Sequence, residues 1–585
     1  MKTIDVKLDD HVVLIGENNS GKSSFIHAIF AAIGAGQRLA GREDIFIAST
    51  ETEAPKSREV LIDILIRPID GDGKVIDKFP GASPWLVLWG NGVMQDDDGK
   101  DIVAIRTQLK WNDVRAEYVT ERKFLKDWDL DPAKAHLSKF ADVPAVTSAQ
   151  LEPLALYLLD AQRDIVDDIR SRSSVWGRMV SDHGLPAADV KQLEKDLSDI
   201  NSKIVAGSKV LSHIEGHLGR YHRLLSCEPG GVKITPLARH LRDLGKGMDI
   251  VLSTKRASSF PLNKQSFGTR SLGTVLTFWS HMTWRQQQYG KDTVHPLLAL
   301  EEPEAHLHPQ AQRALFRQIM NEMPGQRIVS SHSPYIAGMT HITKIRHFLK
   351  SGDETTVSQI SQGGPDALTD DDLRKIDRQI IASRGEILFA RALIFFEGET
   401  EEQALPDFAE GYWKEHPNDL GIALIGVGGY AGYSVFLKLA KRFRIPWFIF
   451  SDAEPDAVAK LDKTLKDISE EETSKNPQVV LLPNGLNFEK YLVTDEVKDI
   501  LKELVIKTKS TSPEHEKKVK AEWDAKTDLK ADLIAEFEAN KTKYGAVVGK
   551  SLSAANKIPG KIRDLFDKVK PLIETTPAPT KTDGN

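Results

Sequence analysis

The sequence has 585 residues, of which 40% are hydrophobic and 28% are charged, and its formal net charge is −6. This composition is typical of a soluble protein with several domains, and no run of about 18 apolar residues predicts a membrane span. A single cysteine, Cys227, excludes an intramolecular disulfide and a cysteine-based zinc site. The negative charge gives no overall attraction to nucleic acid, so such binding would need local basic patches or metal ions. The N-terminus lacks a secretory signal pattern, and we expect a cytoplasmic protein.

The first part of the chain predicts an α/β domain. A strand at about residues 5–16 is followed by a helix from Lys22 to about Ile33, and later strand-like runs alternate with helical segments. Turn residues separate the runs within residues 57–125, which predicts an antiparallel sheet there. The strand-like runs are Val60–Ile66, Trp85–Leu88, Ile102–Leu109, a segment from Val232, Pro296–Leu300 and Arg327–Ser330.

Residues 149–225 carry charged side chains at helical spacing. This pattern predicts a helical insertion at about residues 150–228, which would suit an arm or a dimer contact. We therefore expect residues 1–385 to form one α/β domain that contains this insertion.

A second, smaller α/β domain is predicted at residues 386–574. A polar stretch at residues 366–386 precedes it, and four strand–helix steps follow, which predict a parallel sheet. Residues 505–545 are rich in Lys, Glu and Asp and predict solvated helices, and residues 575–585 predict a disordered tail. The four predicted strands are Ala392–Phe396, Ile422–Ile425, Trp447–Phe450 and Val479–Leu482.

Residues 16–23, with the sequence GENNSGKS, fit the phosphate-binding pattern G-x-x-x-x-G-K-S between a predicted strand and a predicted helix. Glycines let backbone N–H groups surround phosphates, and the helix N-terminus adds partial positive charge. Lys22 would reach the β- and γ-phosphates of ATP, and Ser23 would bind Mg²⁺. The candidate nucleotide contacts in this loop are Gly16, Asn18, Asn19, Gly21, Lys22, Ser23 and Ser24.

A second part of the ATP site is predicted at residues 296–304, where an apolar strand ends in acids. Glu301 would hold Mg²⁺ through water, and Glu302 would orient or deprotonate the attacking water. The usual first acid is Asp, so the Glu301 side chain is one methylene longer than the common pattern. The alternative interpretation is a strand end with solvated acids.

Two further segments resemble parts of ABC-type ATPases, especially of the SMC branch. Residues 302–309 resemble the D-loop, and residues 330–334 (SSHSP) resemble the segment that carries the switch histidine. The resemblance implies that His332 contacts the γ-phosphate.

The resemblance also implies a site shared between two copies of the chain. Residues 267–274 (FGTRSLGT) are similar to a divergent ABC signature, whose Ser271 and Gly273 would bind the γ-phosphate held by a partner subunit. Gln162 is a candidate Q-loop residue. Two such domains must face each other, so we expect a twofold homodimer or a higher even-numbered oligomer.

Acidic side chains follow the strands of the second predicted sheet. Carboxyl ends of parallel strands meet at one sheet edge, and clustered carboxylates repel each other unless a cation neutralises them. Oxygen ligands without His or Cys favour Mg²⁺ or Mn²⁺, and two such ions could hold both oxygens of a phosphodiester exchange. Capping of helix N-termini is the alternative, and we prefer it for Glu399. The candidate ligands and catalytic acids are Glu397, Glu401, Asp452, Glu454 and Glu489.

The segments Glu397–Glu401 and Asp452–Glu454 resemble the metal-binding motifs of the Toprim domain. An SMC-like ATPase followed by a Toprim domain resembles the OLD (overcoming lysogenisation defect) family of ATP-dependent endonucleases over nearly the whole chain. This sequence has Asp-x-Glu at residues 452–454 where the Toprim pattern is Asp-x-Asp. The resemblance also implies a late lysine that stabilises transition-state charge, and both Lys543 and Lys550 are candidates.

The leading hypothesis is an ATP-hydrolysing, metal-dependent DNA endonuclease or nickase. The alternative is an ATP-switched DNA-binding clamp with a degenerate Toprim domain, which the Asp-x-Glu departure favours. RNA as substrate is not separable by these motifs, and a topoisomerase would need a DNA-gate domain with a nucleophilic tyrosine, which is not evident. By analogy with the family, the setting would be anti-phage defence or DNA repair, with a helicase-like partner encoded nearby.

Overall fold

The computed structural model describes most of the chain. The described residues are 3–34, 41–48, 50–129, 131–154, 156–159, 187–221, 230–236, 249–254, 257–261, 264–266, 268–269, 272–273, 276, 279–280, 283, 287, 295–305, 307–323, 325–352, 354–360, 368–381, 384–483 and 485–574. Within these residues, no helix combines the length and the apolar character that a membrane crossing needs.

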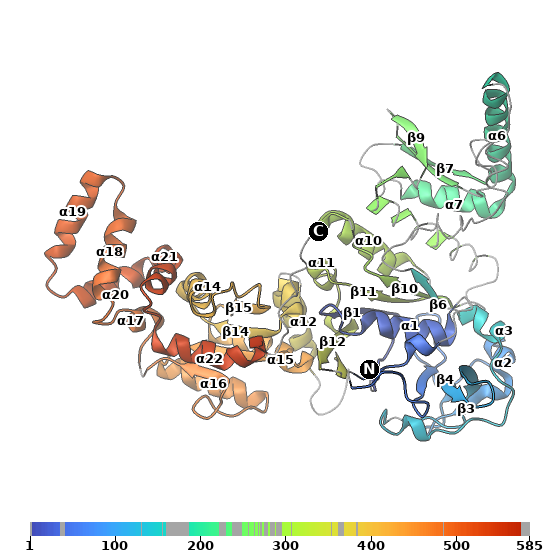
Figure 1. Cartoon of the computed structure of the whole chain (residues 1–585), viewed down its shortest axis with the longest axis horizontal. Helices are drawn as coiled ribbons and strands as arrows, with labels where there is room; N and C mark the ends of the chain where they lie inside the picture. Colours follow the sequence, from blue (N-terminus) through green and yellow to red (C-terminus); the bar gives the residue numbers. More distant parts are fainter. Residues whose placement is uncertain are drawn as a thin grey trace. The chain divides into compact units, whose positions relative to one another are not determined.

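A six-stranded sheet forms the centre of the N-terminal unit, with the strand order β13-β12-β1-β11-β10-β6 (Figure 1). The neighbours of β1, β10 and β11 along this order all run parallel to them. β1 and β10 are almost wholly buried, as expected of parallel strands covered on both faces. The strands are β1 (His11–Gly16), β6 (Leu156–Leu159), β10 (Leu297–Glu301), β11 (Gln326–Ser330), β12 (Ile345–Ser351) and β13 (Glu354–Gln359).

This sheet confirms three predicted elements and corrects others. Helix α1 (Lys22–Ile33) and strands β10 and β11 lie where the sequence predicted them, whereas β1 begins at His11 and not near residue 5. β6 was predicted as part of the helical insertion and is instead the edge strand beside β10. Its short apolar run, Leu-Tyr-Leu-Leu, has no periodicity that separates a strand from a helix.

An antiparallel sheet lies beside it in the same unit. β2 (Val60–Ile66) and β4 (Asp101–Asn112) pair as predicted, and β3 (Val93–Gln95) and β5 (Glu117–Phe124) complete the sheet. The predicted strand at 85–88 is wrong, because these residues belong to helix α2 (Pro84–Trp89). The Ser83 hydroxyl caps that helix and Pro84 occupies its first turn, which outweighs the strand preference of Trp, Leu and Val.

The insertion contains helices α6 (Ala187–Gly207) and α7 (Lys209–Arg220), which pack together. A small antiparallel sheet follows, formed by β7 (Gly230–Thr235), β8 (Asp249–Thr254) and β9 (Ala257–Pro261). The helical prediction is therefore confirmed for the described residues 187–220, and residues 160–186 lie outside the described residues.

The C-terminal unit is built on a second parallel sheet with the order β15-β14-β16-β17. All four strands lie where the sequence predicted them. They are β14 (Ala392–Phe396), β15 (Ile422–Gly426), β16 (Trp447–Ser451) and β17 (Val479–Leu481), and helices α14 (Glu399–Trp413), α15 (Tyr433–Phe443) and α16 (Pro455–Asp467) follow the first three.

The charged C-terminal stretch forms helices that share a core. Their apolar sides bury Val505, Trp523 and Phe537, so the stretch is more than the solvated surface that its charge predicted. The helices are α17 (Phe488–Leu492), α18 (Lys498–Lys509), α19 (Pro513–Asp524), α20 (Leu529–Ala539), α21 (Lys541–Ala554) and α22 (Gly560–Glu574).

Helix α21 packs directly along α14. Gly545 and Gly549, one turn apart, face α14, and a Cβ on Gly549 would lie 2.6 Å from the carbonyl oxygen of Ala404. Small residues at this spacing let the two backbones approach closely. The contact places the first residue of α21, Lys541, beside the start of α14.

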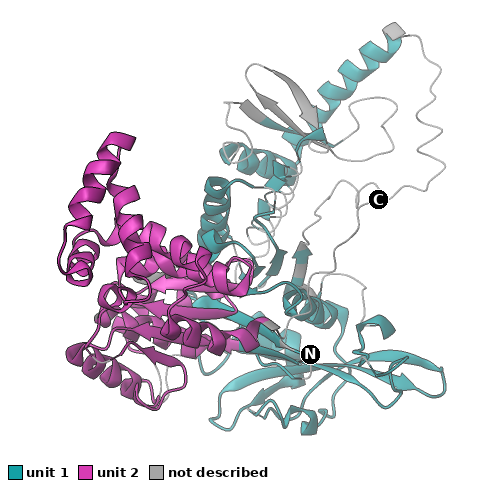
Figure 2. Ribbon diagram, turned by 60° about the vertical axis from the view of Figure 1, so that its left-hand side comes forward, with its two compact units in different colours: residues 1–340, 344–357 teal, residues 341–343, 358–585 magenta. Residues whose placement is uncertain are grey.

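The chain divides into two compact units, residues 1–340 with 344–357 and residues 341–343 with 358–585 (Figure 2). This division lies earlier in the chain than the predicted boundary at residue 385. The difference arises because helix α12 (Asp370–Ile376) packs on α15, where the Lys438 ammonium lies 2.6 Å from an Asp372 carboxylate oxygen. The segment before β14 thus belongs to the C-terminal unit, and residues 575–585 lie outside the described residues.

Candidate active sites

The phosphate-binding loop begins where β1 ends. Gly16 has φ +143°, and a Cβ there would lie 2.2 Å from the carbonyl oxygen of Phe348, so only glycine fits. Gly21, with φ +99°, is the residue before the first turn of α1. The loop therefore has the left-handed residues that turn backbone N–H groups toward a phosphate. Asn18, Asn19, Ser23 and Ser24 are exposed around it.

Lys22 is folded onto this loop. Its ammonium donates to the carbonyl oxygens of Gly16 at 3.0 Å and Glu17 at 2.9 Å. Burial lowers the pKa of Lys22 to about 8, although the charges of Glu302, Glu17 and Glu304 oppose the shift. The lysine thus sits at the position from which it could move to a nucleotide phosphate.

The acids at the end of β10 lie near the same loop, because β11 is the single strand between β10 and β1 in the sheet. The Glu301 carboxylate is 3.9 Å from His27 Nε2 on α1. Glu302 has φ +45°, an unfavourable conformation for a non-glycine residue, and its carboxylate is 3.8 Å from His332 Nε2. The structure therefore brings Glu301, Glu302 and His332 together, as the sequence predicted.

Glu304 joins the two segments, and the sequence reasoning gave it no role. Its Oε1 atom accepts from Ser331 Oγ at 2.7 Å and from the His332 backbone N–H at 2.9 Å. Burial raises the pKa of Glu304 despite these hydrogen bonds. Glu304 thus holds the loop that contains His332 against the end of β10. In the sequence, only its position two residues after Glu302 could have indicated this role.

The predicted signature region is described only in part. Gly268, Leu272 and Gly273 are buried in helical backbone. Ser271 and Gln162 lie outside the described residues, so both remain predictions.

A second group of acids lies at the carboxyl edge of the C-terminal sheet. Glu397 follows β14, and its Oε1 atom accepts from Ser451 Oγ at 2.5 Å and from the Tyr433 hydroxyl at 3.3 Å. Burial raises the pKa of Glu397 to about 7, and the charges of Asp452 and Glu454 act in the same direction.

Four further acids lie at this edge, and their charges act on one another. Burial raises the pKa of Glu401 to about 8 and that of Asp452 to about 6. The Asp452 charge contributes to the first shift, and the charges of Glu489 and Glu454 contribute to the second. Glu489 is buried on α17 and accepts from Thr400 Oγ1 at 2.6 Å. Glu454 is exposed at the start of α16. All five predicted acids therefore belong to one site.

The cation at this site is Lys541, which the sequence reasoning missed. Its ammonium lies 3.3 Å from Glu489 Oε1. Burial lowers the pKa of Lys541, but the charges of Glu489, Glu401 and Asp452 raise it above its ordinary value. The close packing of α21 on α14 produces this position, and no short sequence motif encodes it.

The predicted lysines Lys543 and Lys550 are exposed elsewhere on α21. The Lys543 ammonium lies near the Tyr544 ring, and the charge of Lys550 acts on Asp407. Two residues along a helix turn a side chain about 200° away, so Lys543 cannot share the direction of Lys541. The late-lysine role of Lys543 or Lys550 therefore stays a prediction, and the structure adds Lys541 as a third candidate.

The donor set suits a hard divalent cation. Asp452 Oδ1 is buried without a hydrogen-bond partner, and three acids have raised pKa values because burial and their neighbours disfavour their charged forms. In the described part of the chain, no three acid, imidazole or thiol groups are already gathered around one metal position.

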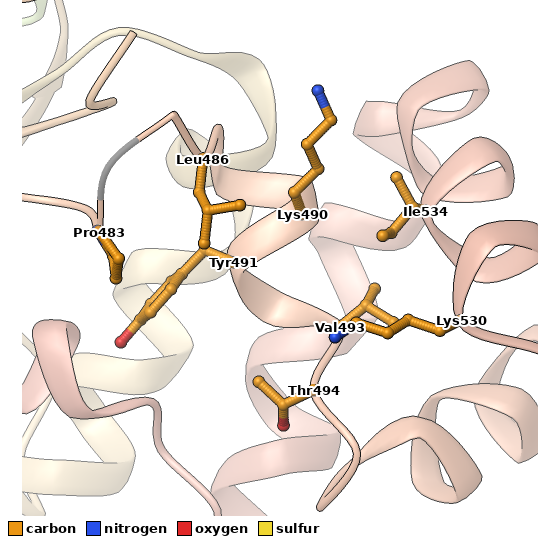
Figure 3. A pocket seen from close by; sticks show the side chains of 8 residues that line it. All are labelled: Pro483, Leu486, Lys490, Tyr491, Val493, Thr494, Lys530 and Ile534. Carbon is orange, nitrogen blue, oxygen red and sulfur yellow. The ribbon is translucent and has the colours of Figure 1, made fainter.

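A pocket of about 400 Å³ is lined by residues on or next to α17 and by Lys530 and Ile534 of α20 (Figure 3). Lys530 reaches across from α20 toward Val493, and Lys490 stands at the rim. Lys490 is paired with Glu538 at 3.6 Å. The pocket contains no acid among its lining residues, so it is separate from the carboxylate site.

Two family models match the chain. The model described as "Overcoming lysogenization defect protein-like, TOPRIM domain" matches residues 388–453, and that described as "AAA ATPase domain" matches residues 152–337. The first covers β14 to β16 with Glu397, Glu401 and Asp452, and the second covers β10, β11 and His332.

Three curated relatives share parts of the sequence. The chain is 26% identical to an uncharacterized protein, YbjD, of Escherichia coli over 35% of this chain and 36% of that protein. It is 30% identical to the OLD nuclease of Thermus scotoductus over 26% of this chain and 30% of that protein. It is 22% identical to the endonuclease GajA of Bacillus cereus over 47% of this chain and 44% of that protein. The chain thus matches less than half the length of each.

Solved structures resemble the two parts separately. The C-terminal region of the Xanthomonas campestris OLD protein covers 32% of this chain and 96% of its own length, with 21% identity and a TM-score of 0.25. An SMC head bound to the C-terminal winged-helix domain of ScpA covers 60% of this chain and 92% of its own length, with 14% identity and a TM-score of 0.37. The two family models place a segment similar to an ATPase domain before a segment similar to an OLD-like Toprim domain, in the order that the sequence predicted.

Proposed function

We propose that this protein is an ATP-hydrolysing, divalent-metal-dependent DNA endonuclease or nickase. The observation that carries the proposal is the juxtaposition of Glu397, Asp452 and Lys541. The two acids end neighbouring strands of the Toprim sheet, and Lys541 pairs with Glu489 beside them. Acids and one cation around a common space are the groups that phosphodiester hydrolysis needs.

The acids would hold Mg²⁺ or Mn²⁺, and we propose two ions. The proposed ligands are Glu397, Glu401, Asp452, Glu454 and Glu489. Bound ions would supply an activated water and charge stabilisation at both reacting oxygens. Ser451 and Tyr433 hold Glu397 in one orientation, because both hydroxyls donate to the same oxygen. Lys541 would stabilise negative charge on the phosphate in the transition state, the role that the sequence assigned to Lys543 or Lys550.

The ATPase site would bind ATP and Mg²⁺. We propose that Lys22 leaves the carbonyl oxygens of Gly16 and Glu17 when phosphates enter, and that Ser23 and Glu301 hold the ion. Glu302 would orient the attacking water beside His332. Burial and the Lys22 charge lower the pKa of His332, so the neutral imidazole is favoured near neutral pH.

The active form would be a twofold dimer. Helix α6 has apolar residues at alternating spacings of three and four, which is typical of a helix–helix seam. Leu193, Ile200 and Ile204 of this seam are 39%, 43% and 36% exposed. A second copy of α6 would cover them. The double variant Leu193→Lys/Ile200→Lys should therefore be a monomer by light scattering, and Lys195→Glu, outside the seam, should leave the dimer intact.

Supercoiled plasmid provides the test. The wild type should nick it in Mg²⁺ or Mn²⁺, with and without ATP compared side by side, and Glu397→Ala should not. Glu399→Ala is the matched control, because Glu399 is the exposed first residue of α14, two positions after Glu397. No cutting in any metal, beside robust ATP hydrolysis, would instead support the ATP-switched DNA clamp. Cleavage of an RNA of the same length in parallel would distinguish the two nucleic acids.

A further inference from the structure

The loop after β15 brings an aromatic residue to the carboxylate site. β15 pairs with β14 up to Gly426 opposite Phe396, and the Val427 N–H donates to the Phe396 carbonyl at 2.8 Å. The loop therefore starts level with Glu397. Gly428 and Gly429 have φ +69° and +97°, which permit the sharp turn that delivers Tyr430.

The Tyr430 side chain contacts one acid and one lysine. Its hydroxyl is hydrogen-bonded to the Glu454 carboxylate, and the Lys460 ammonium lies 5.2 Å from the centre of its ring. Burial and the charges of Glu397, Glu454 and Asp452 raise the pKa of Tyr430 to about 12. In this hydrogen bond the Tyr430 hydroxyl is the donor and a Glu454 carboxylate oxygen is the acceptor.

Two other acids of the site have the same arrangement. Glu397 accepts from Ser451 and Tyr433, and Glu489 accepts from Thr400. A hydroxyl donor restricts the rotation of each carboxylate and leaves its second oxygen for a cation. Tyr430 supplies this donor to Glu454, the most exposed of the five acids and the one that departs from Asp-x-Asp. A Glu side chain has one more rotatable bond than Asp, so it benefits more from such a partner.

We propose that Tyr430 is a positioning residue with two contacts: its hydroxyl orients Glu454 toward the metal, and its ring fixes the Lys460 ammonium where a substrate phosphate enters. This inference rests on the proposed nuclease function, whose substrate phosphate it places. A cation held on an aromatic face loses less freedom when it binds a phosphate than a fully solvated lysine does.

Three variants separate the two contacts. Tyr430→Phe removes only the hydroxyl, Lys460→Gln removes only the ammonium, and Tyr430→Ala removes both supports. Mn²⁺ binding to the full chain is measured by calorimetry, and binding of a fluorescent DNA duplex is measured by anisotropy in Ca²⁺ at several salt concentrations. Nicking rates then give kcat and KM. Unchanged circular dichroism and melting temperature establish that each variant is folded.

Tyr430→Phe should weaken Mn²⁺ binding by about 3- to 10-fold, the loss of one ordinary hydrogen bond, with DNA affinity unchanged. Lys460→Gln should leave Mn²⁺ binding unchanged, weaken DNA binding several-fold and reduce the salt dependence of DNA binding by about one ion. Tyr430→Ala should show both effects.

Two results would overturn the inference. Wild-type Mn²⁺ binding in Tyr430→Phe would show that the hydroxyl does not orient Glu454. An unchanged salt dependence in Lys460→Gln would show that the lysine meets no phosphate. Both readouts are independent of cleavage, so a wild type that binds Mn²⁺ and DNA without cutting contradicts the proposed function alone. A wild type without Mn²⁺ binding contradicts both.

Discussion

The two candidate sites are electrostatic opposites. In the N-terminal unit, Lys22 is buried among carbonyl oxygens, and its pKa is lowered to about 8. In the C-terminal unit, Glu397 and Glu401 are buried near other acids, and their pKa values are raised to about 7 and about 8. In the first site the ammonium donates to carbonyl oxygens and not to a carboxylate, and in the second the five acids outnumber Lys541.

This difference determines which ligand should stabilise each unit. A buried charge without a full partner costs free energy, so each site is arranged for a ligand of opposite sign. ATP should stabilise the N-terminal unit, and divalent metal should stabilise the C-terminal unit. The sites should therefore be separable by mutation.

The largest expected effects are the separate losses of the two activities. Lys22→Ala should reduce ATP hydrolysis by a factor of 100 or more, of the order seen when one charge-stabilising group is removed, and should leave Mn²⁺ binding intact. Glu397→Ala should have the reverse effect, with cleavage lost and ATP hydrolysis kept. Phosphate release and plasmid nicking measure the two. Loss of both activities in either variant would contradict the division into two sites.

The next effect concerns the lysine of the carboxylate site. Lys541→Met should lower the nicking rate by about 100-fold with little change in DNA affinity, because its charge acts on the transition state. Lys543→Met and Lys550→Met are matched controls on the same helix and should cut like the wild type. A stronger defect in either control than in Lys541→Met would restore the sequence-based assignment.

Metal-free stability should fall as pH rises. Glu397, Glu401 and Asp452 have folded-state pKa values of about 7, 8 and 6, above their ordinary values, so the folded state binds more protons than the unfolded state in this range. Their stabilisation is complete below about pH 4 and is lost as pH rises through 6 to 8. In EDTA, the melting temperature of the C-terminal unit should drop by several degrees between pH 5 and pH 8.

Metal should reverse this trend, because only the ionised carboxylates bind it. The increase in melting temperature on adding Mn²⁺ should grow over the same pH range. The variant Glu397→Gln should show a smaller drop in EDTA and a smaller increase with Mn²⁺. A melting temperature that rises with pH in EDTA would show that the acids are not buried as described.

The sequence predicted those parts of the sites that follow a strand directly. In the first sheet, the residues that follow β1, β10 and β11 lie together, because parallel strands end at one sheet edge. In the second sheet, the residues that follow β14 and β16 lie together for the same reason. Lys541 could not be predicted in this way. Its position depends on Gly545 and Gly549 fitting against α14, a contact between helices distant in sequence. The predictions at β6 and α2 were wrong for a local reason, because short apolar runs are compatible with both a helix and a strand.

The C-terminal unit is made of two segments that are separate in the sequence. Residues 341–343 belong to the C-terminal unit, although residues 344–357 return to the N-terminal one. There the Asp377 carboxylate accepts from the Ile342 N–H at 2.9 Å and pairs with His341 at 2.9 Å. A fragment that starts at residue 358 would lose both partners of this half-buried acid. The C-terminal unit is thus not one contiguous segment of the chain, and a fragment made by a single truncation would not contain all of it.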